Sequence, residues 1–132
     1  MSEAVNAVSV KGIYKNYGDV EALRDMSLDF PKGQLTSLLG PSGCGKTTLL
    51  KIIAGLLIPN QGEVYVNDQI VTEPGPDRAF VFQDFALMPW ASVIRNVAFG
   101  LELRKVAKSE REDIARKYIK QVGLDGFENS FP

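Results

Sequence analysis

The feature that most constrains this chain is a glycine-rich loop, GPSGCGKT at residues 40–47, which lies between two apolar segments. The segment before it, residues 34–39, is a mostly apolar run that suits a strand buried on both faces. The segment after it, residues 46–57, carries Leu or Ile at every fourth position, which predicts a helix. A strand, a tight loop and a helix in this order indicate an α/β fold.

The loop matches the phosphate-binding pattern G-x-x-x-x-G-K-[ST]. Its glycines allow a tight curl that points several backbone N–H groups at one anion, and the positive end of the following helix faces the same point. Lys46 adds a flexible positive charge for the β- and γ-phosphates, and the Thr47 hydroxyl is placed to ligate Mg²⁺. The alternative is a glycine-rich turn with an incidental lysine, which the flanking strand and helix disfavour. We therefore predict a nucleotide site formed by Gly40, Pro41, Ser42, Gly43, Cys44, Gly45, Lys46 and Thr47.

The composition excludes several other kinds of site. The 132 residues contain no His and a single cysteine, Cys44, so Ser-His or Cys-His catalysis, a His-ligated zinc site and an internal disulfide are impossible within this sequence. The net charge of −1 argues against a nucleic-acid partner, because nucleic-acid binders usually carry a basic excess. The longest apolar stretch, residues 49–58, is interrupted by Lys51 and is too short to span a bilayer.

Shorter patterns predict the remaining strands and helices. Short strands are expected at residues 8–14, 27–30, 63–66, 70–71 and 79–82. Turns are expected at residues 59–62, where the helix of residues 46–57 ends, and at residues 67–68. In the second half, Ser92 is a good N-cap for a helix that runs to about Leu103. Ser109 and Glu112 form a capping-box pattern for another helix, and Gly123 is a natural residue to follow its end.

The longer string GPSGCGKTTLLKIIAGLLIPNQGEV resembles the ATP-binding subunits of ABC transporters. This resemblance implies an α/β fold: a P-loop NTPase (RecA-like) core with an N-terminal antiparallel β subdomain and the start of a helical subdomain. It places the β subdomain and the P-loop core at about residues 1–83, and the Q-loop and the start of the helical subdomain at about residues 84–132. It implies ATP and Mg²⁺ as ligands, and ATP hydrolysis that drives transport.

The resemblance also gives roles to residues outside the G-x-x-x-x-G-K-[ST] pattern. Tyr17, in KNYGDVEAL, lies where the family has an aromatic residue that stacks on adenine. Tyr14 is another candidate, and an ordinary core or surface tyrosine is the alternative. Thr48 would bind the α-phosphate, or else it is a helix residue that faces inward. Cys44 lies inside the loop, so we expect Mg-ATP to slow its alkylation.

Gln83, in VFQDFALMPW, lies at the position of the family's Q-loop glutamine, whose amide contacts the metal or the attacking water. The alternative is an ordinary polar residue at the end of a strand. By the resemblance, Lys46 and Gln83 are catalytic, and Thr47 and Gln83 are metal ligands.

The segment from Asp84 to Trp90 resembles the surface with which the family contacts its membrane permease. Alternatively, Leu87 and Trp90 pack under the helix that follows. The resemblance implies two further partners, a second ATPase subunit and a separate solute-binding protein. It also implies a peripheral location on the cytoplasmic face of the cell membrane.

The string PGPDRAFVFQDFALMPWASVIRNVAFGLEL is most similar to the nitrate/sulfonate/taurine importers within this family. The finer match depends on PGPDR before Gln83 and on Met-Pro-Trp after it. It implies an importer of small anions of that kind. The sequence does not specify the solute, because in such importers the permease and the binding protein select it.

Several family motifs are absent from the sequence, which contains no Leu-Ser-Gly-Gly signature, no apolar strand ending in Asp-Glu and no histidine. We therefore interpret the chain as a fragment that corresponds to about the first half of the family's domain. Without a general base, which is worth about 10²–10⁴-fold in rate, hydrolysis by this chain alone is expected to be very weak. The alternative is a non-hydrolysing ATP-binding remnant or regulatory module. We also expect marginal solubility, because residues 34–39 would leave an apolar strand edge exposed.

Overall fold

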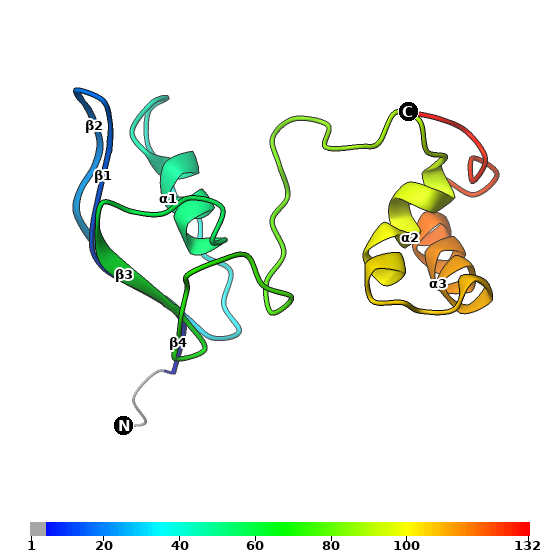
Figure 1. Ribbon diagram of the computed structural model, residues 1–132, viewed down its shortest axis with the longest axis horizontal. Helices are drawn as coiled ribbons and strands as arrows, with labels where there is room; N and C mark the ends of the chain where they lie inside the picture. The colour runs from blue at the N-terminus through cyan, green and yellow to red at the C-terminus, as the bar shows by residue number, and fades with distance from the viewer. Residues whose placement is uncertain (1–4) are drawn as a thin grey trace. The chain divides into compact units, whose positions relative to one another are not determined.

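The computed structural model describes residues 5–132, which form two compact units. The first unit ends at Val81, and the second runs from Phe82 to Pro132. The first contains a β-sheet with one helix against it, and the second contains a pair of helices (Figure 1).

The sheet of the first unit has four antiparallel strands in the order β2-β1-β3-β4. The strands β1 (Asn6–Tyr17) and β2 (Val20–Pro31) form a long hairpin, whereas β3 (Gln61–Val66) and β4 (Gln69–Ile70) form a short one. The first hairpin is longer than expected, because backbone pairing continues through its polar residues to the Tyr17–Val20 pair. The expected turn at residues 67–68 is confirmed, and both of its residues have a positive φ.

One face of this sheet is covered by α1 (Lys46–Ile53), and the core lies between them. The helix ends four residues earlier than the sequence predicted. At its end, Gly55 adopts φ 77°, and the N–H of Leu56 donates to the carbonyl of Lys51 at 2.9 Å. This is a Schellman motif, which stops a helix by turning the chain through a left-handed residue. The buried side chains of the core are those of Val10, Ile13, Leu23, Leu49, Ile52 and Val64.

The strands predicted at residues 34–39 and 79–82 are absent from the structure, where both segments are irregular. Leu35 and Leu39 are 97% and 92% exposed, so residues 34–39 are not a strand buried on both faces. A strand persists only when a neighbour accepts and donates its backbone hydrogen bonds. Within residues 5–132, none of the strands pairs with residues 34–39, and this explains why the apolar run alone does not form one.

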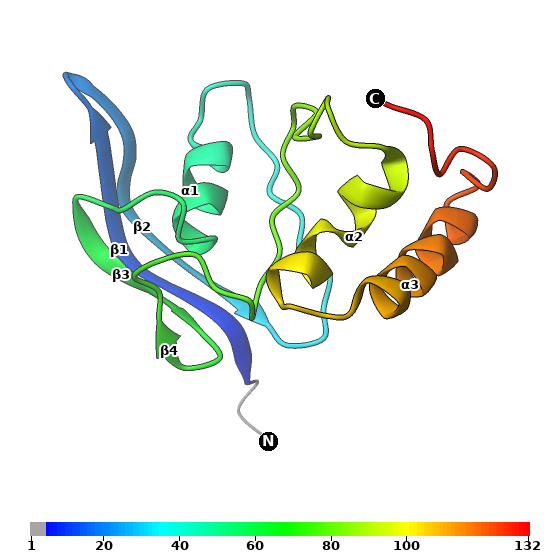
Figure 2. The same ribbon diagram turned by 45° about the vertical axis from the view of Figure 1, so that its right-hand side comes forward.

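The second unit is built on α2 (Val93–Leu103) and α3 (Lys108–Gln121), which lie side by side in Figures 1 and 2. Ser92 occupies the N-cap position of α2 as predicted, although its side chain makes no capping hydrogen bond. Four small or branched side chains close the interface between the two helices: Ile94, Ala98, Ala115 and Ile119.

The predicted capping box of α3 is wrong. The helix begins at Lys108, so Ser109 lies in its first turn and Ala107 takes the N-cap position. Glu112 instead faces Lys108 at 3.9 Å and Arg116 at 4.0 Å. The Glu112 carboxylate thus pairs with cations one turn before it and one turn after it on the helix, instead of accepting a hydrogen bond from the backbone at the start of α3.

The predicted end of α3 is confirmed. Gly123 has φ 76°, and the N–H of Leu124 donates to the carbonyl of Ile119 at 3.0 Å, which is again a Schellman motif. The same motif ends α2, but there the left-handed residue is Lys105, with φ 59°. Lysine carries a Cβ that strains this conformation, whereas glycine does not.

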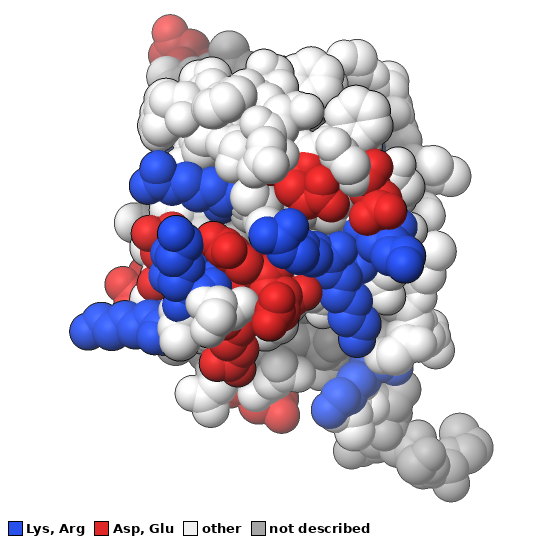
Figure 3. All heavy atoms as spheres, turned by 90° about the vertical axis from the view of Figure 1, so that its right-hand side faces the viewer, with Lys and Arg blue, Asp and Glu red and all other residues white. Residues whose placement is uncertain are grey.

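Figure 3 shows Lys and Arg interspersed among Asp and Glu over part of the surface, next to an area without charged side chains. The exposed ion pairs on α2 and α3 each stabilise the fold by about 0–1 kcal/mol. Among the residues that the structure describes, none of the helices is long and apolar enough to cross a membrane.

Candidate functional site

The glycine-rich loop leads directly into α1, whose N-cap residue is Gly45 with φ 93°. The first turn of α1 holds no acidic residue, and no side chain makes a capping hydrogen bond to it. The first backbone N–H groups of a helix have no partner within the helix, and they carry the positive end of its dipole. The start of α1 is therefore suited to an anion.

The ammonium group of Lys46 is held over this loop by the loop itself. Its Nζ donates to the carbonyl oxygens of Gly40 at 2.8 Å and Pro41 at 2.7 Å, and it lies 3.3 Å from the Sγ of Cys44. Gly40 is close to the same sulfur, since a Cβ on Gly40 would lie 2.8 Å from it. The loop is thus closed around the ammonium group of its own lysine, which keeps a positive charge at the start of α1.

Gly45 seats the loop on strand β2. A Cβ at this position would lie 2.6 Å from the carbonyl oxygen of Ala22 and 2.7 Å from Cδ2 of Leu23. Neither distance is compatible with a side chain, so the loop approaches the strand this closely only because residue 45 is glycine. Leu23 in turn pairs with Lys15 of β1, which places the loop beside the end of the long hairpin.

The two threonines of α1 differ in exposure. Thr47 is exposed in the first turn, where its hydroxyl is accessible to a ligand, and Thr48 is half-buried. Pro41, Ser42 and Gly43 are exposed along the loop. Their expected roles in binding the nucleotide and the metal stay predictions, as does protection of Cys44 by Mg-ATP.

Tyr17 lies at the last position of β1 and is 49% exposed. The Nζ of Lys15 lies 5.7 Å from the centroid of the Tyr17 ring. Tyr14 is half-buried and lies within the β1–β3 pairing. Tyr17 is therefore the better placed of the two tyrosines to stack on a base, although neither stacking role is tested.

Gln83 lies in the second unit, in the irregular segment that precedes α2, and its side chain is exposed. The loop with Lys46 belongs to the first unit. The structure brings Lys46, Thr47 and Gly45 together, and joint action of Lys46 with Gln83 stays a prediction.

The segment after Gln83 displays its apolar side chains rather than burying them. Phe85 is 97% exposed and Trp90 is 73% exposed, so the packing of Trp90 under the next helix is not observed. Leu87 is exposed as well. Large apolar side chains left exposed within one short segment are typical of an interaction surface.

The sequence did not reveal what holds this segment in shape. Asn96 of α2 accepts a hydrogen bond from the N–H of Met88 at 2.9 Å, and its Nδ2 donates to the carbonyl of Met88 at 3.2 Å. The same Nδ2 donates to the carbonyls of Ala91 at 2.9 Å and Ser92 at 3.2 Å. The only signal in the sequence is an amide side chain near the start of a helix, one turn after its N-cap.

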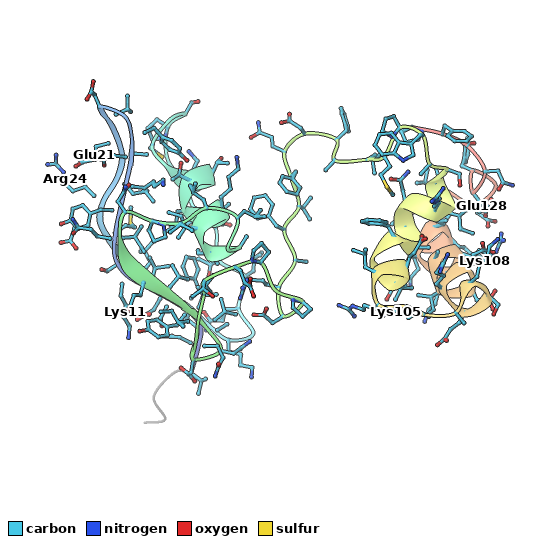
Figure 4. All side chains as sticks on the ribbon, in the orientation of Figure 1. Lys11, Glu21, Arg24, Lys105, Lys108 and Glu128 are labelled. Atoms are coloured by element: carbon cyan, nitrogen blue, oxygen red, sulfur yellow. The ribbon has the colours of Figure 1, made fainter. Side chains whose placement is uncertain are left out.

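The residues with the clearest pKa shifts lie away from the loop. On β2, a hydrogen bond to Glu21 raises the pKa of Arg24 (Figure 4). A hydrogen bond to Glu63 raises the pKa of Tyr65, whose ring also lies 4.6 Å from Nζ of Lys11. These are surface interactions of the sheet and do not contribute to the loop.

Comparisons with known proteins agree with this geometry. A family model described as "ABC transporter" matches residues 23–132. The uncharacterized ABC transporter ATP-binding protein MJ0412 of Methanocaldococcus jannaschii is 50% identical over 117 residues, which are 89% of this chain and 44% of that protein. The taurine import ATP-binding protein TauB of Yersinia pestis is 44% identical over 124 residues, which are 94% of this chain and 49% of that protein. The chain thus spans about half the length of the curated relatives it matches.

Solved structures give the same result for the fold. The post-hydrolysis dimer of the ATP-binding cassette MJ0796, bound to ADP and Pi, superposes with a TM-score of 0.82 at 31% identity. The match covers 95% of this chain and 61% of that one. The predicted α/β fold of a P-loop NTPase is therefore confirmed, with this chain spanning part of it.

Proposed function

The chain belongs to the ABC transporter family, and we propose that it binds Mg-ATP as part of an ATPase subunit that drives solute import. The observation that carries the proposal is the loop closed around Lys46 at a helix start that no side chain caps. A triphosphate fits this arrangement, because backbone N–H groups and one ammonium would share its negative charge.

Each residue of the loop has a part in this proposal. The backbone N–H groups of residues 40–45 would hold the phosphates, Lys46 would contact the β- and γ-phosphates, and Thr48 would contact the α-phosphate. The exposed hydroxyl of Thr47 and the amide of Gln83 would hold Mg²⁺, which neutralises charge that develops on the phosphates. Hard oxygen ligands of this kind suit Mg²⁺.

Tyr17 supplies the base-binding surface. Its ring is half-exposed at the end of β1, and strand β2 connects that end to the loop through Leu23 and Gly45. Adenine would stack on the ring while the loop holds the phosphates.

The second unit supplies the contact with the membrane partner. The exposed side chains of Phe85, Leu87 and Trp90 support a permease interface in the segment from Asp84 to Trp90. We place the boundary between the β subdomain with the loop core and the Q-loop with the helical subdomain at about residues 83–84. In the assembled transporter, this chain and a second ATPase subunit lie at the cytoplasmic face of the cell membrane, and a separate solute-binding protein completes the system.

The solute belongs to the nitrate, sulfonate and taurine class in this proposal. Its support is the similarity to taurine import proteins and the strings PGPDR and Met-Pro-Trp around Gln83. These 132 residues contain no Leu-Ser-Gly-Gly signature and no apolar strand ending in Asp-Glu, so the proposal assigns to them nucleotide binding rather than hydrolysis by this chain alone.

Thermal unfolding with and without Mg-ATP tests the proposal. Ligand at a hundred times its Kd stabilises a native protein by about 2.7 kcal/mol. The Lys46→Ala variant should lose most of this shift, whereas Lys117→Ala, which removes an exposed lysine from α3, should keep it. A wild-type chain that shows no shift, or an unchanged shift in Lys46→Ala, would refute the proposed site.

A further inference from the structure

Strand β1 runs three residues beyond the last of its β3 partners. The β1–β3 pairing ends at Tyr14 and Gln61, whereas β1 itself continues to Tyr17. On its other side, β2 follows β1 to the end, through to the Tyr17–Val20 pair. A two-stranded hairpin without further support is only marginally stable. The end that carries Tyr17 therefore needs support on the side that β3 leaves open.

The connection between α1 and β3 supplies this support. The N–H of Asn60 donates to the carbonyl of Tyr14 at 2.8 Å, and the N–H of Asn16 donates to Oδ1 of Asn60 at 2.8 Å. Nζ of Lys15 donates to the carbonyl of Ile58 at 2.8 Å. We call these three hydrogen bonds, made by residues 14–16 with residues 58–60, the Asn60 latch.

The side chain of Asn60 provides a hydrogen-bond acceptor that a neighbouring strand would otherwise provide. Strand β3 begins at Gln61, and residues 58–60 before it are not part of a strand. The N–H of Asn16 therefore has no β3 carbonyl opposite it. The amide oxygen of Asn60 takes the place of that carbonyl and prolongs the ladder by one bond. Nζ of Lys15, which donates to Ile58, lies over the Tyr17 ring at 5.7 Å from its centroid, so the latch also places a cation over that ring.

We propose that Asn60 is a positioning residue for base recognition, which holds Tyr17 in the orientation that stacks on adenine. The inference rests on the proposed nucleotide function and adds a residue that contacts neither the base nor the phosphates. The phosphate loop is seated on β2, by Gly45 on Ala22 and Leu23, whereas both latch hydrogen bonds of Asn60 go to β1. Loss of the latch should therefore weaken binding of the base and leave binding of the phosphates unchanged.

Calorimetric titration of the full chain with Mg-ATP and with Mg-tripolyphosphate, which has no base, separates these two contributions. Stacking of a base on an aromatic side chain is worth about five- to a hundredfold in affinity. Asn60→Ala should lose part of the affinity that stacking contributes, so that its affinity for ATP falls about three- to tenfold. Its affinity for tripolyphosphate should change by less than about twofold. Asn60→Asp keeps an oxygen acceptor for the N–H of Asn16 and should restore ATP binding.

Two further variants complete the experiment. Asn6→Ala removes an amide side chain from the opposite end of β1 and should leave both affinities unchanged. In a Tyr17→Ala background, Asn60→Ala should have no additional effect, because the ring that it positions is gone.

The outcomes distinguish the latch from the nucleotide site. Equal losses for ATP and tripolyphosphate in Asn60→Ala, or full additivity with Tyr17→Ala, would overturn the positioning role while leaving the phosphate site intact. A wild-type chain that binds neither compound would refute the proposed function, and the role of Asn60 with it.

Discussion

Replacement of Gly45 by alanine should destabilise the first unit far more than the same replacement at Gly43. Both glycines have a positive φ, 93° for Gly45 and 81° for Gly43, so both variants introduce backbone strain. They differ in the space available. A Cβ at Gly43 meets nothing within 4 Å, whereas a Cβ at Gly45 would lie 2.6 Å from the carbonyl oxygen of Ala22.

The magnitude follows from these two contributions. A left-handed conformation costs a residue with a Cβ about 1–2 kcal/mol, and both variants incur this cost. The overlap with Ala22 and Leu23 adds about 1–3 kcal/mol, the usual cost of forcing an extra carbon into a packed site. We expect a loss of about 1–2 kcal/mol for Gly43→Ala and about 2–5 kcal/mol for Gly45→Ala.

Urea unfolding followed by far-ultraviolet circular dichroism measures both losses, and hydrogen exchange of the β1 and β2 amides locates them. Gly45→Ala should raise exchange around Ala22 and Leu23 specifically, because the loop must move away from the strand there. Equal losses for the two variants would refute the close seating of the loop on β2.

Three further predictions concern the second unit. Asn96→Ala should destabilise the second unit by about 1–3 kcal/mol, because its partly buried hydrogen bonds to the segment before α2 are lost. Urea unfolding followed by Trp90 fluorescence measures this loss, and an equal loss in the exposed control Arg95→Ala would contradict it. Lys105→Gly should stabilise the second unit by about 0.5–1 kcal/mol, because the relief of strain at the left-handed Lys105 exceeds the entropic cost of glycine. Thermal unfolding measures the change, and a lower stability of Lys105→Gly would contradict the prediction. The pKa of Glu128 is lowered by hydrogen bonds from its own backbone N–H and from that of Gly126. Its contribution to stability is therefore present above the unfolded-state pKa and is lost as the pH falls through the lower folded-state pKa. An NMR titration should place the carboxyl pKa of Glu128 below that of an ordinary glutamate, and Glu128→Gln should remove the associated acid dependence of stability.

Local patterns in the sequence were sufficient for elements that depend on nearby residues. The loop at residues 40–47, the turn at residues 67–68 and the left-handed Gly123 after α3 were all predicted, since each depends on glycine or asparagine chemistry within a few positions. The α2 helix was predicted from Ser92 as its N-cap.

Features that depend on distant partners were not predictable in this way. Residues 34–39 have the composition of a buried strand, but a strand also needs neighbours, and sequence pattern does not supply them. Ser109 and Glu112 fit a capping box, yet Glu112 faces cations on both sides along the helix. The sequence at residues 59–62 indicated only a turn, and the role of the Asn60 amide appears only once β1 lies beside it.

The three hydrogen-bond contacts of Lys46 also affect the free energy with which it binds a phosphate. An ammonium group has three hydrogens to donate, and Gly40, Pro41 and Cys44 provide three acceptors for them. A phosphate oxygen can therefore gain a hydrogen bond from Lys46 only if one of these acceptors gives it up. Binding is an exchange of partners, whose heat is the difference between two similar bonds. The same lysine holds the loop closed and attracts the phosphate. The stability of the closed loop and the affinity for phosphate therefore depend on one side chain.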